Sequence, residues 1–125
     1  MKLIYEQEVY DIIGACYEVY NELHCGLAEP IYQEALELEF KLRGIPYLRE
    51  VPLEVYYKGE KLRKRYVADF VCYEDIIIEL KAAEEITNDH IAQILNYLHI
   101  TKSPLGVLVN FGNKRKLEWS RYINL

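Results

Sequence analysis

The sequence predicts an α/β fold in which helices cover a mixed β-sheet. Apolar residues recur at helical spacing in three segments, and they alternate or run continuously in segments of strand length. These patterns follow one another in the order helix, helix, three strands, helix, strand, which favours an α/β sandwich. The 125 residues are 51% hydrophobic and 28% charged, as in ordinary soluble domains, so we expect residues 1–125 to form a single domain.

Two helices are expected in the first third of the chain. The first covers about residues 6–23 and is followed by Gly26, which suits a left-handed cap. The second begins near Glu29, has Pro30 in its first turn, where a missing N–H does no harm, and ends at Gly44. The residues expected to face the core are Val9, Ile12, Ile13, Cys16, Tyr20 and Leu23, then Ile31, Ala35, Leu38 and Leu42.

The remaining segments alternate between strand and helix. Strands are predicted over residues 47–57, 61–73, 76–82 and 105–111, a helix over about 87–100, and a last strand or short helix over 116–123. The Lys-Gly-Glu stretch at 58–60 is typical of a hairpin turn. Pro104 ends the third helix, whose expected inward residues are Ile91, Ile94, Leu95 and Leu98.

Charge and cysteine content limit the class of protein. A formal net charge of −5 excludes a generic polyanion binder, although it leaves room for a local basic face. The three cysteines lack metal-ligand spacing and are expected to be reduced, buried side chains. The N-terminal stretch MKLIYEQEVYD resembles neither a signal peptide nor a membrane anchor, so we expect a cytoplasmic protein that does not bind membranes.

Charged residues interrupt two of the predicted strands. Asp69 lies in one apolar run, and Glu79 and Lys81 lie in the next. With a turn centred on Glu74, antiparallel pairing places Asp69 opposite Glu79, with Cβ atoms about 4.5–5.5 Å apart. Glu79 and Lys81 share a face because side chains alternate along a strand. A register slip of one residue would separate the two carboxylates.

The spacing of these residues is compatible with two interpretations of the cluster. Opposed carboxylates repel, and a hard divalent cation with oxygen ligands relieves the repulsion. Two such acids with a neighbouring lysine suit metal-assisted phosphodiester hydrolysis, with Lys81 orienting the attacking water or neutralising charge in the transition state. The alternative is a buried ion pair between Lys81 and the acids.

The predicted third helix adds polar candidates. His90, Gln93 and Tyr97 fall on one helical stripe. Gln93 could bond a phosphate or a metal-bound water, and Tyr97 could bond Lys81 or a substrate group. The alternatives are a solvated Gln93 and a Tyr97 that only packs between helix and sheet. His90 is expected to make a polar contact near the rim of the site.

The chain resembles the GxxExxY protein family, a small-domain branch of the PD-(D/E)XK nuclease-like superfamily. The resemblance rests on the stretches IIGACYEVYNELHCGLAEPIYQEAL, ADFVCYEDIIIELKA, HIAQILNYL and LGVLVNFG, with the motif residues Gly26, Glu29 and Tyr32. It implies a restriction-endonuclease-like core of a helix, three strands, a helix and a strand, preceded here by an extra N-terminal helix.

The resemblance also implies roles for individual residues. Asp69 and Glu79 match the metal-binding acids, and Lys81 matches the catalytic lysine. Glu29 matches an additional acid near the metal, and the backbone carbonyl of Leu80 is a further metal ligand in related sites. Gln93 and Tyr97 resemble a Gln-x-x-x-Tyr element of exonuclease-like branches.

Basic residues gather in two clusters that suggest a nucleic-acid substrate. Residues 58–65 hold five basic side chains, of which Lys61, Arg63, Lys64 and Arg65 form what we call the basic strand cluster, and residues 113–116 add three. If both clusters lie along one rim, they would follow a nucleic-acid backbone. The neighbouring Tyr56, Tyr57 and Tyr66 would stack on bases. The alternative is a solvated edge strand whose lysines prevent edge-to-edge pairing.

Together these features predict a nuclease that hydrolyses phosphodiester bonds in DNA, and less strongly in RNA, with Mg²⁺ or Mn²⁺ as cofactor. Asp69 and Glu79 would hold the ion, Glu29 would act through a second ion or a bound water, and Lys81 would position the nucleophile. Two rival readings remain: a noncatalytic module that binds nucleic acid or protein, and a subunit that works only with a partner chain. Whether the chain forms a homodimer stays open.

Overall fold

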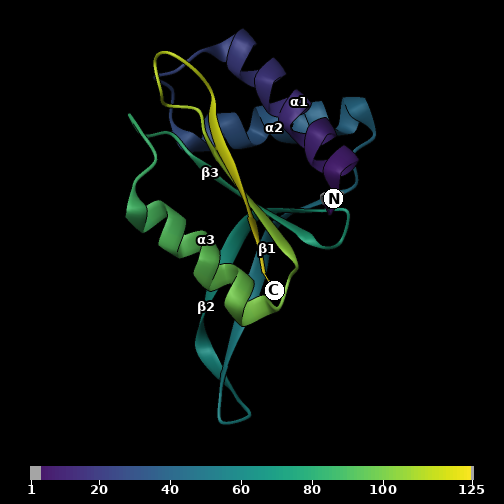
Figure 1. The fold of residues 1–125 in the computed structure, drawn as a ribbon, viewed down its shortest axis with the longest axis vertical. Helices are drawn as coiled ribbons and strands as arrows, with labels where there is room; N and C mark the ends of the chain where they lie inside the picture. Colours follow the sequence, from purple (N-terminus) through teal and green to yellow (C-terminus); the bar gives the residue numbers. More distant parts are fainter. Residues whose placement is uncertain (1–3, 125) are drawn as a thin grey trace.

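A five-stranded mixed sheet lies between two helical layers in the computed structural model, which describes residues 4–124 (Figure 1). The elements are α1 (Glu6–Leu23), α2 (Glu29–Arg43), β1 (Tyr47–Tyr57), β2 (Glu60–Cys72), β3 (Ile76–Lys81), α3 (Asn88–Thr101), β4 (Leu105–Asn110) and β5 (Glu118–Ile123). The predicted α/β fold with a restriction-endonuclease-like order of elements is confirmed, and the segment left open near the C-terminus is a strand.

The strands lie in sequence order, β1-β2-β3-β4-β5. Neighbouring strands are antiparallel except β3 and β4, which are parallel and are connected by α3. A parallel pair needs a crossover of this kind, because a short turn cannot return the chain to the same end of the sheet. The crossover places α3 directly after the charged end of β3.

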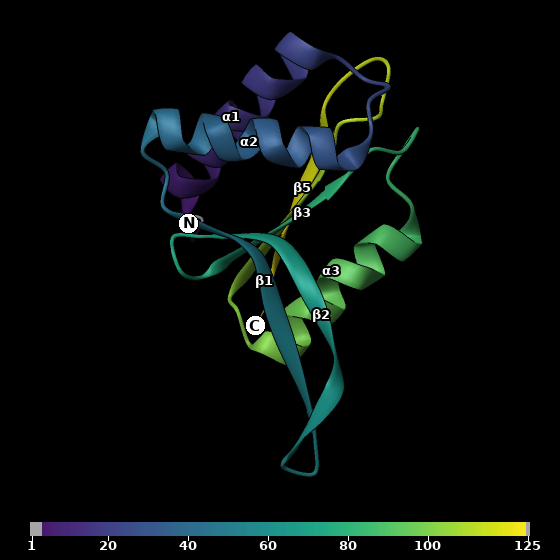
Figure 2. The same cartoon turned by 180° about the vertical axis from the view of Figure 1, so that it is seen from behind.

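The two faces of β3 contribute to two separate core clusters. Ile76, Ile78 and Leu80 pack with residues of α1 and α2, whereas Ile77 packs with residues of α3. Figure 2 shows the same arrangement from behind, with α2 and α3 on different sides of the strands. By strand alternation, Glu79 and Lys81 therefore belong to the face covered by α3.

The buried face of α2 is rotated by about one residue from the expected one. Ile31, Leu38 and Leu42 are exposed, and the buried positions are Tyr32, Gln33, Leu36 and Phe40. The reason is aromatic packing: Tyr32 stacks on Phe111 with ring centroids 4.8 Å apart, and Phe40 meets Phe70 edge-on at 5.1 Å. These contacts join segments far apart in the chain, so helical periodicity alone could not identify them.

The start of α3 is held by a reciprocal cap. Thr87 accepts a hydrogen bond from the His90 backbone N–H through its hydroxyl, and its own backbone N–H donates to His90 Nδ1 at 3.1 Å. His90 thus makes a polar contact, as expected, and that contact closes a capping box. In the same helix, Ile94 and Leu98 are buried as predicted, whereas Leu95 is exposed.

The outer halves of β1 and β2 form a hairpin that projects away from the rest of the molecule (Figures 1 and 2). Residues 60–67 of β2 are all exposed, which accounts for the polar composition of this strand segment. Within residues 4–124, no helix has the length and apolar character required to cross a membrane.

Candidate functional site

The hairpin between β2 and β3 brings Asp69 and Glu79 together. Its pairs are Phe70 with Ile78, Val71 with Ile77, and Cys72 with Ile76, which is the register of a turn centred on Glu74. The predicted register is therefore confirmed. Continuing it by one step places Asp69 opposite Glu79.

At this position, hydrogen bonds from backbone N–H groups to the two carboxylates take the place of the usual backbone hydrogen bonds between β2 and β3. The backbone N–H of Asp69 donates to Glu79 Oε1 at 3.0 Å, and the backbone N–H of Leu80 donates to Asp69 Oδ2 at 2.7 Å. Each acid thus bonds the backbone of the opposite strand. These two hydrogen bonds hold both carboxyl groups in position.

Burial makes this pair of acids unfavourable in its fully ionised form. Burial and, after it, the charge of Asp69 raise the pKa of Glu79 to about 8, although the hydrogen bond from the Asp69 backbone N–H lowers it in part. Burial likewise raises the pKa of Asp69 to about 6, opposed by the Leu80 N–H. Glu79 is only 5% exposed. The pair therefore retains a proton near neutral pH unless a cation compensates its charge.

Lys81 does not neutralise the acids by direct contact. Its Nζ donates a hydrogen bond to Gln93 Oε1 at 2.8 Å, and none of the ion pairs within 4.0 Å among residues 4–124 includes it. Its charge still acts through space, lowering the pKa values of Asp69 and Glu79. The closed ion pair considered from the sequence is therefore absent from the described structure.

Glu29 stands beside this cluster at the first residue of α2. Partial burial raises the pKa of its carboxyl and the charge of Lys81 lowers it, while Glu29 in turn raises the pKa of Asp69. Its residue as a whole is exposed, so water screens much of this interaction. Glu29 shares the electrostatic environment of the cluster without a direct hydrogen bond to it.

The loop before Glu29 is fixed by Tyr32. The Tyr32 hydroxyl accepts a hydrogen bond from the Leu27 N–H at 3.1 Å and donates one to the carbonyl of His24. Gly26 has a φ of 105°, a backbone conformation that favours glycine. The spacing Gly-x-x-Glu-x-x-Tyr thus has a structural reason, because the glycine permits the turn and the tyrosine anchors it next to the acid.

Gln93 and Tyr97 both reach the cluster from α3. Gln93 is half-buried and holds Lys81, as described above. Tyr97 is 4% exposed, and burial, reinforced by the charges of Glu79 and Asp69, raises its pKa. Its phenol therefore stays protonated at neutral pH. Tyr97 also packs between helix and sheet, as the alternative interpretation expected, since its ring belongs to the core cluster under α3.

Three polar residues near the site had no role in the sequence interpretation. Gln33, buried on α2, lies with its Nε2 3.5 Å from Asp69 Oδ1, and its Oε1 accepts from Arg49 Nη2 at 3.2 Å. Arg49 also bonds Glu37 Oε1 at 2.8 Å, which ties β1 to α2. The only sequence signal was the spacing of four residues between Glu29 and Gln33, which places both on one helix face.

Asn110, the third of these residues, fixes the chain just beyond Lys81. It is fully buried, its Oδ1 accepts from the Ala83 N–H at 2.9 Å and its Nδ2 donates to the Ala83 carbonyl at 2.9 Å. The neighbouring Gly112 packs so closely that a Cβ there would lie 2.3 Å from the Ala83 carbonyl oxygen. The end of β3 is thereby held against β4.

The donor set of the cluster suits a hard divalent cation. Asp69 and Glu79 offer carboxylate oxygens, and the Leu80 carbonyl lies between the acid and the lysine on β3. Burial is the main cause of their raised pKa values, and the charge of Lys81 offsets it only in part. In the part of the chain that the structure describes, no three His, Cys, Asp or Glu side chains lie close enough together to hold an ion. The side-chain ligands would therefore be two, with backbone and solvent oxygens completing the shell.

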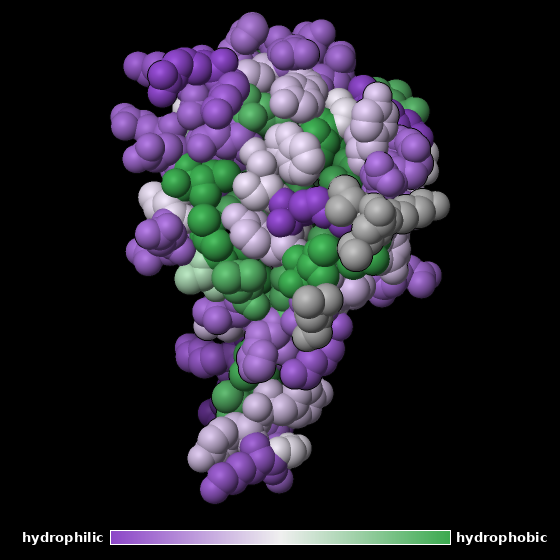
Figure 3. Space-filling model, in the orientation of Figure 1, coloured by the Kyte–Doolittle hydropathy of each residue, from purple (hydrophilic) through white to green (hydrophobic). Residues whose placement is uncertain are grey.

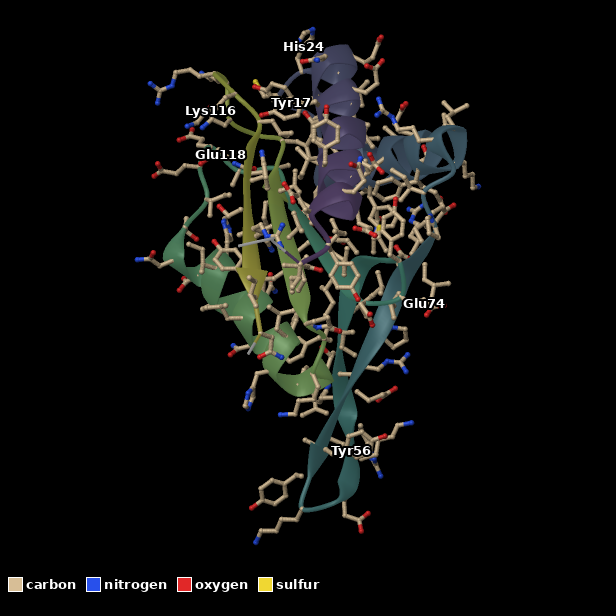
Figure 4. All side chains as sticks on the ribbon, turned by 45° about the vertical axis from the view of Figure 1, so that its right-hand side comes forward. Tyr17, His24, Tyr56, Glu74, Lys116 and Glu118 are labelled. Atoms are coloured by element: carbon tan, nitrogen blue, oxygen red, sulfur yellow. The ribbon has the colours of Figure 1, made fainter. Side chains whose placement is uncertain are left out.

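The two basic clusters lie at opposite ends of the molecule, so the condition that both lie along one rim is not met. Lys61 pairs with Tyr56 near the tip of the projecting hairpin, and Figure 4 shows Tyr56 and Lys116 far apart along the long axis. The basic strand cluster is exposed, and Figure 3 shows the hairpin covered mainly by hydrophilic residues. Glu54 partly offsets its charge, at 3.4 Å from Arg65 and 3.9 Å from Lys61.

Similarity to known proteins extends over nearly the whole chain. The family model described as the PD-(D/E)XK nuclease superfamily matches residues 6–122. A solved structure titled "Crystal structure of SSO0001" is similar with a TM-score of 0.60 at 19% sequence identity, covering 96% of this chain and 60% of that one. This chain thus spans only part of that structure's length, and at such an identity the likeness shows a shared fold. No curated protein is detectably similar to this chain.

Proposed function

The chain belongs to the PD-(D/E)XK nuclease superfamily, and on that basis we propose that it is a divalent-metal-dependent nuclease that hydrolyses phosphodiester bonds in DNA, or secondarily in RNA. The observation that carries the proposal is the cross-strand pair of carboxylates, half-buried Asp69 and buried Glu79, next to Lys81, which forms no ion pair with any residue from 4 to 124. We further assign the chain to the GxxExxY branch as a single domain, because Gly26 and Tyr32 support the loop that ends at Glu29.

The proposed roles follow from position and charge. Asp69, Glu79 and the Leu80 carbonyl would hold Mg²⁺ or Mn²⁺, which when bound supplies polarisation of the phosphate and acidification of water. Glu29, farther out, would act through a second ion or a water. Lys81 would orient the nucleophile or neutralise charge in the transition state.

Two residues of α3 complete the assignment. Gln93 would position Lys81, whose ammonium group it already binds. Tyr97, protonated at neutral pH, would donate a hydrogen bond to a substrate group near the acids.

A time course on end-labelled single- and double-stranded DNA and RNA, in Mg²⁺, Mn²⁺ or EDTA, tests the activity. We expect cleavage with either ion and none in EDTA or in the Asp69→Asn, Glu79→Gln double variant. Cleavage by that variant would reveal a contaminating nuclease. A wild-type chain that binds nucleic acid but cleaves none of the substrates would contradict the proposal and leave a noncatalytic binding module.

The basic strand cluster is proposed to contact the phosphate backbone. Replacing Lys61, Arg63 and Lys64 with glutamine should weaken binding to all sequences alike. It should also reduce the slope of log affinity against log salt concentration by about 2 to 3, because binding releases about one counterion for each phosphate that a basic side chain neutralises. A fluorescence titration at several salt concentrations measures this slope. The matched control replaces Lys114, Arg115 and Lys116, at the opposite end, with the same change in net charge. Equal effects of both triple variants would indicate only general electrostatic attraction.

A further inference from the structure

We propose that a small hollow beside Lys81 is a binding subsite for one unpaired nucleobase, an inference that rests on the proposed nuclease function and specifies its substrate. The hollow has a volume of about 220 Å³ and is lined by Tyr66, Asp89, Ala92, Gln93, Asn96 and Tyr97. Pockets that hold drug-sized ligands measure roughly 300–1,000 Å³, so this one suits a single planar ring system.

The hollow adjoins the carboxylate cluster through two shared residues. Gln93 lines it and at the same time accepts the hydrogen bond from Lys81 Nζ at 2.8 Å. Tyr97 also lines it and lies close enough to Glu79 and Asp69 for their charges to act on its phenol. A nucleotide with its base in the hollow would therefore have its phosphate within reach of Lys81.

Tyr66 provides a prepared surface for stacking. It remains 47% exposed, yet its ring rests against that of Tyr97, with centroids 5.2 Å apart and planes inclined by 46°. Tyr97 is fixed in a core cluster with Ile77, Ile94 and Leu98. Because the buried ring supports the exposed one, Tyr66 loses little conformational freedom when a base stacks on it.

The polar groups of the hollow match a base better than a phosphate. Asp89, Gln93 and Asn96 project from one face of α3, at spacings of four and three residues. Asp89 carries the only formal charge of the lining and would repel a phosphate while accepting from base N–H groups. Gln93 uses its carbonyl oxygen for Lys81, which leaves its amide N–H groups for a base edge.

This arrangement has a consequence for the substrate. A base inside a duplex is stacked on both sides and paired at its edge, so it offers neither surface to the hollow. The substrate should therefore carry an unpaired nucleotide next to the cleaved phosphate, as in a single strand, an overhang or a flipped base. Stacking on tyrosine is open to every base, so any preference among bases would come from the polar groups of the hollow, Asp89 among them.

Equilibrium binding in EDTA tests the subsite without requiring cleavage. The probes are a labelled single-stranded oligothymidylate, the same strand made of abasic units, and a blunt duplex. We expect Tyr66→Leu, which keeps apolar bulk but removes the ring, to weaken binding of the oligothymidylate roughly tenfold or more, with the abasic strand and the duplex unaffected. Tyr66→Phe should bind like the wild type. Tyr17→Leu, at a similarly exposed tyrosine of α1, is the matched control and should change nothing.

The outcomes separate this inference from the proposed activity. If Tyr66→Leu weakens binding of the oligothymidylate alone and the wild type cleaves no substrate, the subsite is supported and the nuclease activity is contradicted. Cleavage by a wild type whose Tyr66→Leu variant binds all three probes normally would support the nuclease and overturn the subsite. Equal loss for all three probes in Tyr66→Leu would also overturn it, because stacking requires a base. Asp89→Asn should alter the relative affinities for the four homopolymers, and unchanged ratios would remove Asp89 from base recognition.

Discussion

Lys81→Ala should lower the rate of metal-dependent cleavage about 10²- to 10³-fold while changing affinity for nucleic acid by no more than about threefold. The lysine ammonium is held by Gln93 at 2.8 Å and is not consumed by an ion pair with the acids. Its charge is therefore free to act on negative charge that develops during the reaction. Single-turnover rates at saturating enzyme, together with equilibrium binding in EDTA, measure the two effects separately.

Lys64→Ala is the matched control for this experiment. It removes the same charged group from the exposed basic strand cluster, and we expect a modest loss of affinity with no change in the single-turnover rate at saturation. If Lys81→Ala instead lost affinity and rate in the same proportion, the lysine would bind the substrate rather than the transition state. A full rate without Lys81 would remove it from the mechanism.

The second large effect concerns the way in which the free energy of unfolding depends on pH and on a bound metal ion. In EDTA, the free energy of unfolding should fall as pH rises from about 4 to about 8. The pKa of Asp69 is raised to about 6 and that of Glu79 to about 8, so over this range the folded state binds more protons than the unfolded chain. Each pKa unit corresponds to about 1.4 kcal/mol, a sizeable share of the roughly 5–15 kcal/mol that stabilise a domain.

Thermal denaturation from pH 4 to pH 8, with and without millimolar Mg²⁺ or Mn²⁺, measures this dependence. The Asp69→Asn, Glu79→Gln double variant should melt about 10 °C or more above the wild type at pH 8 in EDTA and should gain nothing from the ion. For the wild type, an ion at 100 times its dissociation constant would add about 2.7 kcal/mol. A flat profile in EDTA and no response to the ion would mean that Lys81 already neutralises the acids.

Glu37 provides a control of the opposite sign. Hydrogen bonds from Arg49 and Tyr47 lower the pKa of its carboxyl. A carboxyl with a lowered pKa stabilises the fold above its unfolded pKa and loses that contribution as pH falls. Glu37→Gln should therefore destabilise the protein at pH 8, where the double variant at the site is stabilised.

Local pattern predicted the order of the elements and the pairing of Asp69 with Glu79. The short turn around Glu74 specifies the register, because in a hairpin the length of the turn decides which residues of the two strands lie opposite each other. The candidate acids and the lysine could be identified in this way since they are neighbours along one hairpin. The roles proposed for them remain predictions.

Contacts between distant segments decided the rest. On α2, Tyr32 is buried and Ile31 is exposed, because the Tyr32 ring stacks on Phe111. The choice of Gln93 as the partner of Lys81, and the pairing of Tyr66 with Tyr97, depend on how α3 lies across the sheet. Periodicity specifies which face of an element is apolar. Burial and hydrogen bonding at a site depend on which elements pack together there, and that is a property of the tertiary structure.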